Sequence, residues 1–387
     1  MSSSAFSSFF FLFFVIFFSV FLSAESLTEF SDVEALKAFK SAIKPSTVPS
    51  YSCLGSWDFA SADPCSLPRL THFLCGLTCS GDRVTQLILD KAGYSGTLSP
   101  LISKLTQLIT LDIQSNNFYG PIPTSLSSLP NLQNLVLRDN SFSGSVPPSI
   151  TTLKSLQTLD LSQNSLSGSL PVSMNSLATL RRLDLSFNRL AGAIPPLPSN
   201  LIELAIKANS LSGSLQKSSF YGLTQLEVVE LSQNSFAGTL ESWFFQLPAL
   251  QQVNLANNSF TGVAVPTPTK HNSDLVALDL GFNKIEGYLP VNFASYPVLS
   301  SLSLRYNRLR GQIPAQFNKQ QSLRRLFLDG NFLKGSPPVG LLSGGTTVSG
   351  SLGDNCLQQC PPSSELCLKP QKPASICQQA YGGKPKS

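Results

Sequence analysis

Apolar residues recur along this chain at a fixed spacing, and one polar residue recurs with them. In this pattern, leucines lie eight, five and three residues before an asparagine and two residues after it. The pattern is clearest at Leu156, Leu159, Leu161, Asn164 and Leu166. It occurs eleven times within residues 84–338, and its asparagine position advances by 21 to 25 residues each time. Leucines two residues apart on a short strand point to the same side. Each period therefore predicts one short strand with an apolar face that it cannot bury alone.

A period of this length with this internal spacing is the signature of a leucine-rich repeat. Stacked repeats bury their leucines in one continuous core and pair their strands in parallel. We therefore expect an α/β solenoid, a right-handed leucine-rich-repeat superhelix with a parallel concave sheet and disulfide caps. The asparagine amide both donates and accepts, so we expect it to satisfy backbone groups where each coil turns. This ladder comprises Asn116, Asn140, Asn164, Asn188, Asn209, Asn234, Asn258, Asn283, Asn307 and Asn331, with Ala92 at the same position of the first repeat.

A second motif follows many of the asparagines, for example at residues 120–123 (Gly-Pro-Ile-Pro) and 311–314 (Gly-Gln-Ile-Pro). Together the two motifs resemble the plant-specific extracellular class of leucine-rich repeats. That class occurs in receptor-like proteins, in the ectodomains of receptor-like kinases and in polygalacturonase-inhibiting proteins. The resemblance covers nearly all of the chain after residue 24, and it implies a binding function outside the cell.

The amino end carries an apolar run at residues 9–22, followed by the small residues Ser23 and Ala24. This run is shorter than the roughly 20 residues that cross a bilayer. We therefore interpret residues 1–24 as a secretory signal peptide, with an uncleaved anchor as the alternative. No other segment approaches spanning length, so we expect a protein without a membrane span, secreted to the apoplast or cell wall. The remaining domains are an amino-terminal cysteine cap (25–83), the eleven repeats (84–340) and a carboxyl-terminal cysteine cap and tail (341–387).

Eight cysteines flank the repeats in two groups of four: Cys53, Cys65, Cys75 and Cys79, then Cys356, Cys360, Cys367 and Cys377. Even, clustered counts in a secreted chain predict disulfides, and each group allows three pairings. Four cysteines stand where the cap of the plant family often has a single close pair. Zinc binding is less favoured, because zinc clusters are typical of reducing compartments, and we expect no cofactor.

Both ends of a repeat array expose an open sheet edge and an apolar core, which the two cysteine groups are expected to cover. At the amino end, residues 31–34 (Ser-Asp-Val-Glu) predict a helix that starts with a capping box. Apolar residues then recur at helical spacing at Val33, Leu36, Phe39 and Ile43.

Candidate binding residues lie on the exposed positions of the concave strands. The predicted patch consists of Phe282, Arg305, Tyr306, Arg325 and Phe327, from three adjacent repeats whose strands lie about 4.8 Å apart. Aromatic and arginine side chains are favoured at binding hot spots. Phe187 and Arg182 form a smaller group. The alternative is that these aromatic residues are exposed without consequence.

Three further patterns bear on binding. Aspartates recur four residues before the asparagines, but this position is often acidic in the family whatever the ligand, so we interpret the column as a solvated face. Related peptide-sensing kinases often hold a terminal carboxylate with Arg-x-Arg on one strand, whereas here Arg305 has Ser303 at the companion position. Residues 257–259 (Asn-Asn-Ser) predict N-glycosylation of Asn257.

Catalysis is not supported, because the chain has only two histidines and no nucleophile-base set or phosphate-binding loop. The net charge of +5 is dispersed, which argues against nucleic acid and leaves weak contact with wall polysaccharide open. The leading hypothesis is an extracellular module in plant defence or developmental signalling. Its concave face would bind a protein or peptide, with a membrane receptor kinase or a microbial enzyme as possible partners. One alternative is an inhibitor of a microbial polygalacturonase or other wall-degrading enzyme, and another is a cell-wall scaffold.

Overall fold

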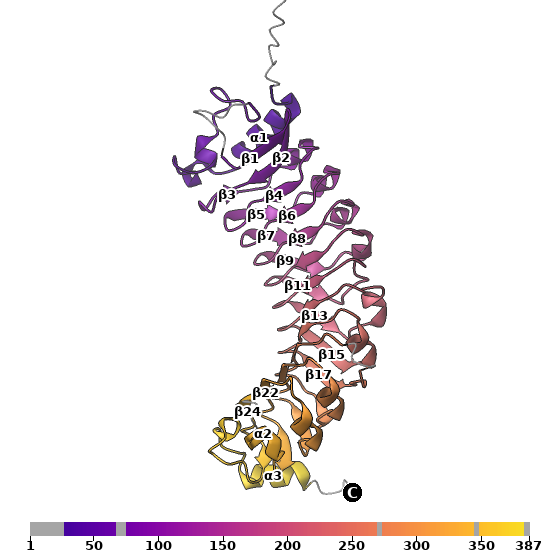
Figure 1. Ribbon diagram of the computed structural model, residues 1–387. Coiled ribbons are helices and arrows are strands. Elements are labelled where there is room, and N and C mark those ends of the chain that lie inside the picture. The colour runs from indigo at the N-terminus through magenta and orange to yellow at the C-terminus, as the bar shows by residue number, and fades with distance from the viewer. Residues whose placement is uncertain (1–26, 67–74, 269–272, 344–347, 383–387) are drawn as a thin grey trace, which may run out of the picture.

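The computed structural model describes residues 27–66, 75–268, 273–343 and 348–382. These residues form a curved stack of coils with helix α1 at the amino end and helix α3 at the carboxyl end (Figure 1). The three α-helices are α1 (Phe30–Ser41), α2 (Val339–Ser343) and α3 (Ala374–Tyr381). The predicted signal peptide lies outside the described residues.

The main sheet follows the concave side of the stack and has 13 strands. The first pair, β1 and β2, is antiparallel, and every later pair is parallel. Its strands are β1 (Leu77–Ser80), β2 (Arg83–Ile88), β4 (Thr110–Asp112), β6 (Asn134–Val136), β8 (Thr158–Asp160), β10 (Arg182–Asp184), β12 (Glu203–Ala205), β14 (Val228–Glu230), β16 (Gln252–Asn254), β18 (Ala277–Asp279), β20 (Ser301–Ser303), β22 (Arg325–Phe327) and β24 (Ser349–Ser351). The predicted α/β solenoid with a parallel sheet is confirmed.

Strands that follow the asparagines form two further parallel sheets, of eight and four strands. The first contains β3 (Ser95–Gly96), β5 (Asn117–Pro121), β7 (Ser141–Gly144), β9 (Ser165–Ser169), β11 (Arg189–Gly192), β13 (Ser210–Gly213), β15 (Ser235–Leu240) and β17 (Ser259–Val263). The second contains β19 (Glu286–Tyr288), β21 (Arg308–Gly311), β23 (Phe332–Gly335) and β25 (Cys356–Leu357). The two sheets are separate at the proline-containing segment after Val263, where the repeat pattern is also interrupted.

Short 3₁₀ helices complete most coils, and the proline-rich residues 193–200 between β11 and β12 form none. Proline lacks an N–H and fixes its own backbone, which accounts for this exception. The 3₁₀ helices are η1 (Pro45–Thr47), η2 (Leu54–Ser56), η3 (Pro100–Lys104), η4 (Thr124–Ser128), η5 (Pro148–Thr152), η6 (Met174–Ser176), η7 (Lys217–Phe220), η8 (Ser242–Gln246), η9 (Val291–Ser295), η10 (Ala315–Lys319) and η11 (Glu365–Cys367).

Each ladder asparagine ties its own coil to the coil before it. In Asn140, Oδ1 accepts a hydrogen bond from the Phe118 N–H at 2.9 Å, and Nδ2 donates to the Ile113 carbonyl at 3.0 Å, both in the preceding coil. Nδ2 also donates to the Leu137 carbonyl of its own coil at 3.2 Å. Buried backbone groups that would otherwise lack partners are satisfied in this way. The direction of the bonds explains why Ala92 is tolerated in the first repeat, which has no repeat before it.

The ladder and the main sheet continue past residue 340, where we placed the boundary of the repeats. Strand β24 pairs with β22, and Asn355 makes the ladder's bonds, accepting from the Leu333 N–H at 3.0 Å and donating to the Leu328 carbonyl at 2.9 Å. The predicted cysteine cap (341–387) includes this coil, whose strand Ser-Gly-Ser lacks the usual leucine. An eleventh ladder asparagine, Asn355, therefore serves the last predicted repeat.

Disulfides close both ends of the array, and every cysteine pairs within its own group. The pairs are Cys53–Cys75, Cys65–Cys79, Cys356–Cys377 and Cys360–Cys367. At the carboxyl end, α3 folds back onto the last coils, where the Tyr381 hydroxyl accepts from the Gly311 N–H at 2.9 Å and donates to the Phe332 carbonyl at 2.5 Å. This contact joins α3 to β21 and β23.

The predicted capping box of the first helix is wrong. Helix α1 begins at Phe30 after Glu29, which makes no side-chain capping bond. Asp32 is fully buried instead and accepts hydrogen bonds from Nε and Nη2 of Arg83 at 3.1 and 2.9 Å and from the Val84 N–H at 2.8 Å. Its carboxylate fastens α1 to β2. Ser31, the predicted capping residue, lies inside the helix, and the Glu34 carboxylate pairs with Lys104 at 2.8 Å.

The ladder can be tested at two adjacent asparagines. Asn116 is buried, accepts from the N–H groups of Gly93 and Tyr94 at 3.0 Å and donates to the Asp90 carbonyl at 3.1 Å. Asn116→Ala is expected to lower the free energy of unfolding by about 3 kcal/mol, because several buried backbone groups lose their partners. The side chain of the exposed neighbour Asn117 makes a single bond, to the Gly93 carbonyl, so Asn117→Ala should cost less than about 1 kcal/mol. Denaturant unfolding measures both; equal effects would contradict the structural role of the ladder.

Candidate functional site

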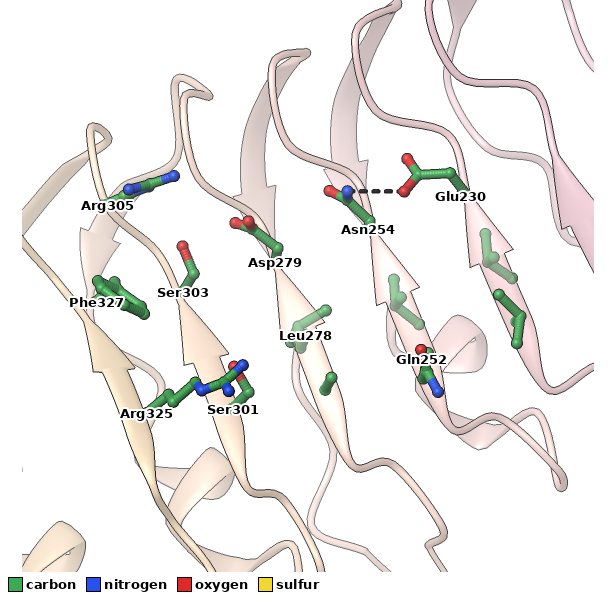
Figure 2. Close-up of a pocket in the computed structure, with 14 residues that line it drawn as sticks. Glu230, Gln252, Asn254, Leu278, Asp279, Ser301, Ser303, Arg305, Arg325 and Phe327 are labelled. Atoms are coloured by element: carbon green, nitrogen blue, oxygen red, sulfur yellow. Dashed lines mark hydrogen bonds between the residues drawn. The ribbon is translucent and has the colours of Figure 1, made fainter. Parts of the chain in front are cut away.

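A groove of about 480 Å³ lies on the concave face over strands β14 to β22. Its polar residues lie on β14, β16, β18, β20 and β22 and, for Arg305, in the turn after β20 (Figure 2). The groove is lined by Val228, Val229, Glu230, Gln252, Val253, Asn254, Ala277, Leu278, Asp279, Ser301, Ser303, Arg305, Arg325 and Phe327. Because neighbouring coils keep one register, equivalent positions of each repeat lie side by side across the groove.

Four of the five residues of the predicted patch are in contact at the rim of this groove. The rings of Phe282 and Tyr306 are stacked, with centroids 4.7 Å apart and planes 14° from parallel. The guanidinium carbon of Arg305 lies 5.1 Å from the ring centroid of Phe282 and 5.6 Å from that of Phe327. Two aromatic faces therefore hold one arginine by cation-π contacts. The fifth residue, Arg325, lies beside Ser301 at the start of its strand.

The backbone explains why aromatic side chains reach this rim. The residue before each ladder asparagine adopts a left-handed conformation in most coils, with φ of 55° at Phe282 and 51° at Tyr306. In the next coil this position is Gly330, where a Cβ atom would lie 2.4 Å from Cδ1 of Tyr306. The absence of a side chain at Gly330 therefore leaves room for the Tyr306 ring to lie across the neighbouring coil.

Charges of both signs lie along the groove, with the arginines at one end, Glu230 at the other and Asp279 between them. Arg305 and Arg325 come from β22 and the turn after β20, whereas Glu230 and Asp279 come from β14 and β18. Glu230 accepts a hydrogen bond from Nδ2 of Asn254 at 2.8 Å (Figure 2). Glu230 and Asp279 were not part of the predicted patch. They could have been found by comparing the same positions of the repeats that precede Arg305.

The acidic residues four positions before the ladder asparagines have a structural role in each described coil that carries one. The Asp279 carboxylate accepts from the Gly281 N–H at 2.8 Å, and Asp112 accepts from the Gln114 N–H at 3.0 Å. The same bond to the backbone two residues later occurs at Asp160, Asp184, Glu230 and Asn254. Side chains of this kind stabilise turns by bonding their own backbone. The recurring acid is thus explained without a ligand.

Two other predicted positions lie apart from the groove. Phe187 contacts Lys207, whose Nζ is 5.7 Å from the ring centroid, while Arg182 forms an ion pair with Glu203 at 3.3 Å. The structure therefore does not join Phe187 and Arg182 as one group.

Asn257 is exposed and occupies the rim position one coil before Phe282. Its glycosylation stays a prediction.

Among the described residues, no cluster of three or more histidine, cysteine, aspartate or glutamate side chains could hold a metal ion. None of the helices in the same part of the chain is both long and apolar enough to cross a bilayer. The arrangement of the groove is suited to binding a polar ligand by shape, charge and aromatic contact.

Known families and structures match this geometry. The family described as "Leucine rich repeat N-terminal domain" matches residues 31–71, and leucine-rich-repeat families match residues 107–129, 130–190 and 199–260. The LRR receptor-like serine/threonine-protein kinase GHR1 of Arabidopsis thaliana is 34% identical over 103 residues, which are 26% of this chain and 9% of that kinase. The matched curated relatives are therefore much longer than the matched segment.

Two solved structures are similar over most of the chain. A plant peptide hormone receptor, RGFR1 in complex with RGF2, is 33% identical with a TM-score of 0.64, and the match covers 70% of this chain and 43% of that chain. The complex of PEPR1 with AtPEP1 is 29% identical with a TM-score of 0.70, covering 84% of this chain and 49% of that one. In both comparisons this chain spans less than half of the solved chain.

These matches, together with the parallel sheet, the asparagine ladder and the disulfide caps, define a leucine-rich-repeat protein. Within that class the chain belongs to the plant extracellular family, whose matched relatives are receptor-like kinases and receptor ectodomains.

The acidic column generates a pH-dependent prediction. Burial raises the pKa of Asp112; hydrogen bonds from Gln114 oppose this effect, and the charge of Asp160 adds to it. Ionised Asp112 is thus less favourable in the folded state than in the unfolded state, so Asp112→Asn is expected to increase the free energy of unfolding at pH 7. The gain should disappear below about pH 4, where the carboxyl is protonated in both states.

Chemical unfolding across that pH range measures the effect. Asp112→Ala is the control, because it also removes the acceptor for the Gln114 N–H and should therefore be less stable than Asp112→Asn at pH 7. If the Asp112→Asn protein is no more stable than the parent at pH 7, the destabilising effect assigned to the ionised Asp112 carboxylate is refuted.

Proposed function

We propose that this protein is an extracellular recognition module that binds a polypeptide ligand in the groove over β14 to β22. The observation that carries the proposal is the Arg305 guanidinium between Phe282 and Phe327, at one end of a groove that has Glu230 at the other. Aromatic residues and arginine contribute large contact area and planar hydrogen bonding, which is why they dominate binding hot spots. A plant peptide hormone receptor, RGFR1 in complex with RGF2, shares this fold, which supports a ligand of the same kind.

The rest of the proposal concerns place and partners. The disulfides at both ends fit an oxidising compartment, so we place the protein outside the cell, in the apoplast or cell wall, after removal of residues 1–24. It would act in defence or developmental signalling, passing the binding event to a partner such as a membrane receptor kinase. Inhibition of a wall-degrading enzyme is the alternative outcome, and it would be recognised by a captured partner whose pectin-cleaving activity the protein reduces.

A glycan placed in the groove tests the proposal. Ser301→Asn creates the acceptor sequence Asn-Leu-Ser within the groove, because Leu302 and Ser303 follow. Ser125→Asn creates the same acceptor sequence in η4, outside the groove, and is a matched control. Each protein, expressed through a secretory pathway and confirmed as glycosylated by mass spectrometry, is used to capture partners from plant extracellular fluid, and affinity for the captured polypeptide is measured by surface plasmon resonance.

The Ser301→Asn glycoprotein is expected to bind at least about ten-fold more weakly, because the glycan occupies the contact surface, while the control binds as the parent does. Enzymatic removal of the glycan should restore most of the affinity, which separates blocking from misfolding. Full binding by the groove glycoprotein, or the absence of any saturable polypeptide partner, would contradict the proposed function.

A further inference from the structure

A second groove, of about 230 Å³, lies between the 3₁₀ helices η7 and η8 of two successive coils. None of its lining residues belongs to a strand of the main sheet, so this outer groove is separate from the concave groove. Most of its lining is apolar or aromatic, and one charged side chain and no carboxylate line it. The residues that matter for its chemistry are Lys217, Tyr221, Thr224, Trp243, Gln246 and Pro248.

Three side chains of the outer groove carry hydrogen-bond donors that have no partner in the described part of the chain. They are the indole N–H of Trp243, the hydroxyl of Tyr221 and the amide of Gln246. The other tryptophan, Trp57, instead donates its indole N–H to the Cys75 carbonyl at 2.8 Å. Tyr221 is 82% exposed, so its ring and hydroxyl are both available to a ligand. The outer groove therefore offers aromatic faces together with free donors.

Buried aromatic rings hold the Trp243 ring in place. Its centroid lies 5.6 Å from that of Phe220 and 5.7 Å from that of Phe244. Phe220 and Phe244 are both buried in the hydrophobic core. A side chain whose orientation is fixed before binding loses less entropy when a ligand arrives, which favours affinity.

The chain itself places a proline-containing segment next to the outer groove. A further pocket, of about 240 Å³, adjoins this groove, because residues 246–248 line both. Pro266 and Pro268 line that pocket together with the aromatic residues Phe245 and Tyr296. Prolines and aromatic rings therefore already pack together on this side of the coils.

Two side chains bind successive carbonyls of that proline-containing segment. The Asn292 amide donates to the Val265 carbonyl at 2.7 Å, and the Tyr296 hydroxyl donates to the Pro266 carbonyl at 3.3 Å. The outer groove offers the same two kinds of donor, an amide and a tyrosine hydroxyl, and adds an indole N–H. The donors of the outer groove are free, whereas those of the neighbouring pocket are occupied by the chain's own carbonyls.

We propose that the outer groove binds a proline-rich segment of a partner polypeptide, in the polyproline II conformation, with an acidic residue of that segment paired to Lys217. A polyproline II helix has no internal hydrogen bonds and proline has no N–H, so such a segment presents carbonyl acceptors and apolar rings. Aromatic-lined grooves are the usual binding sites for it. The rings of Tyr221 and Trp243 pack against the prolines, while their O–H and N–H groups donate to the carbonyls.

Charge determines which proline-containing chain fits. Lys217 is exposed and pairs with no carboxylate of the described residues, so an acidic residue beside the prolines is favoured. The chain's own carboxyl-terminal residues include one proline between Lys384 and Lys386, whose charges Lys217 would repel. A neutral oligosaccharide is less favoured, because its hydroxyls need acceptors as well as donors and no carboxylate lines the groove.

The two tryptophans of the chain allow a direct test by NMR. The full-length secreted protein is labelled with ¹⁵N and titrated with an end-blocked peptide of repeated Pro-Pro-Glu units. The indole N–H signal of Trp243, identified by its absence in Trp243→Phe, is expected to shift saturably, with half-saturation below about 1 mM. The signal of Trp57 should not move, because its N–H is bonded to the Cys75 carbonyl.

Three further ligands separate the contributions of conformation, charge and chemical class. A peptide of repeated Gly-Gly-Glu units keeps the charge and loses the prolines, and one of repeated Pro-Pro-Lys units reverses the charge. Cellohexaose is the neutral oligosaccharide. Each is expected to bind at least about ten-fold more weakly than the Pro-Pro-Glu peptide.

Two variants and one control locate the binding. Tyr221→Ala removes the exposed ring and its hydroxyl, and is expected to weaken binding of the Pro-Pro-Glu peptide by about ten-fold or more. Lys217→Glu should abolish the preference for the Pro-Pro-Glu peptide over the Pro-Pro-Lys peptide. Tyr51→Ala is the matched control, since Tyr51 is 90% exposed in the amino-terminal cap, and it should leave binding unchanged.

An unmoved Trp243 signal, equal binding of the Pro-Pro-Glu and Gly-Gly-Glu peptides, or undiminished binding by Tyr221→Ala would overturn the proline-binding groove. Equal binding of the Pro-Pro-Glu and Pro-Pro-Lys peptides would overturn the acidic partner, and tighter binding of cellohexaose would overturn the choice of a polypeptide. No residue of the concave groove takes part in these measurements, so their outcome is independent of the proposed function.

Discussion

The hydrogen bonds of the asparagine ladder are the constraint on which the structure depends. A coil of this solenoid cannot satisfy all the backbone groups of its inner turn, and the asparagine of the next coil supplies the missing donor and acceptor. Because each asparagine serves the coil before it, the array has unlike ends. The first repeat tolerates Ala92 and is fastened by Asp32 and Arg83, whereas the last predicted repeat requires Asn355 from a further coil.

The ladder also holds the coils in one register, so that single-residue changes are enough to create a binding surface. Since all coils share one register, a residue at a given repeat position lies beside its counterparts in the neighbouring coils. Replacing one member of such a row changes the surface locally and leaves the fold unaltered. Glu230, Arg305 and Phe327, each from a different coil, produce a groove with its own chemistry. The fold is shared with many proteins, and the ligand is determined by these few positions.

The spacing of leucines and asparagines was sufficient to predict the parallel sheet and the ladder, because both follow from local periodicity, and the two cysteine groups predicted the closure of both ends. What depended on distant contacts was not predictable. The capping box failed because the helix begins one residue before Ser31 and Glu34 pairs with the distant Lys104, and the disulfide pairs could not be chosen among three pairings per group. Asn355 was missed since its strand lacks leucine. Of the site, the aromatic and arginine residues were found from their type, whereas Glu230 and Asp279 were missed because the recurring acid was interpreted as a solvated face.

The central claim is that the concave groove over β14 to β22 is the surface that meets the ligand. Hydrogen–deuterium exchange of the protein, alone and saturated with its captured polypeptide partner, tests this most directly. The account predicts new protection in the turns that follow β18, β20 and β22, around Gly281, Arg305 and Asp329, with the 3₁₀ helices of the outer side unchanged. Protection confined to those outer helices, with the concave turns exchanging as before, would contradict it.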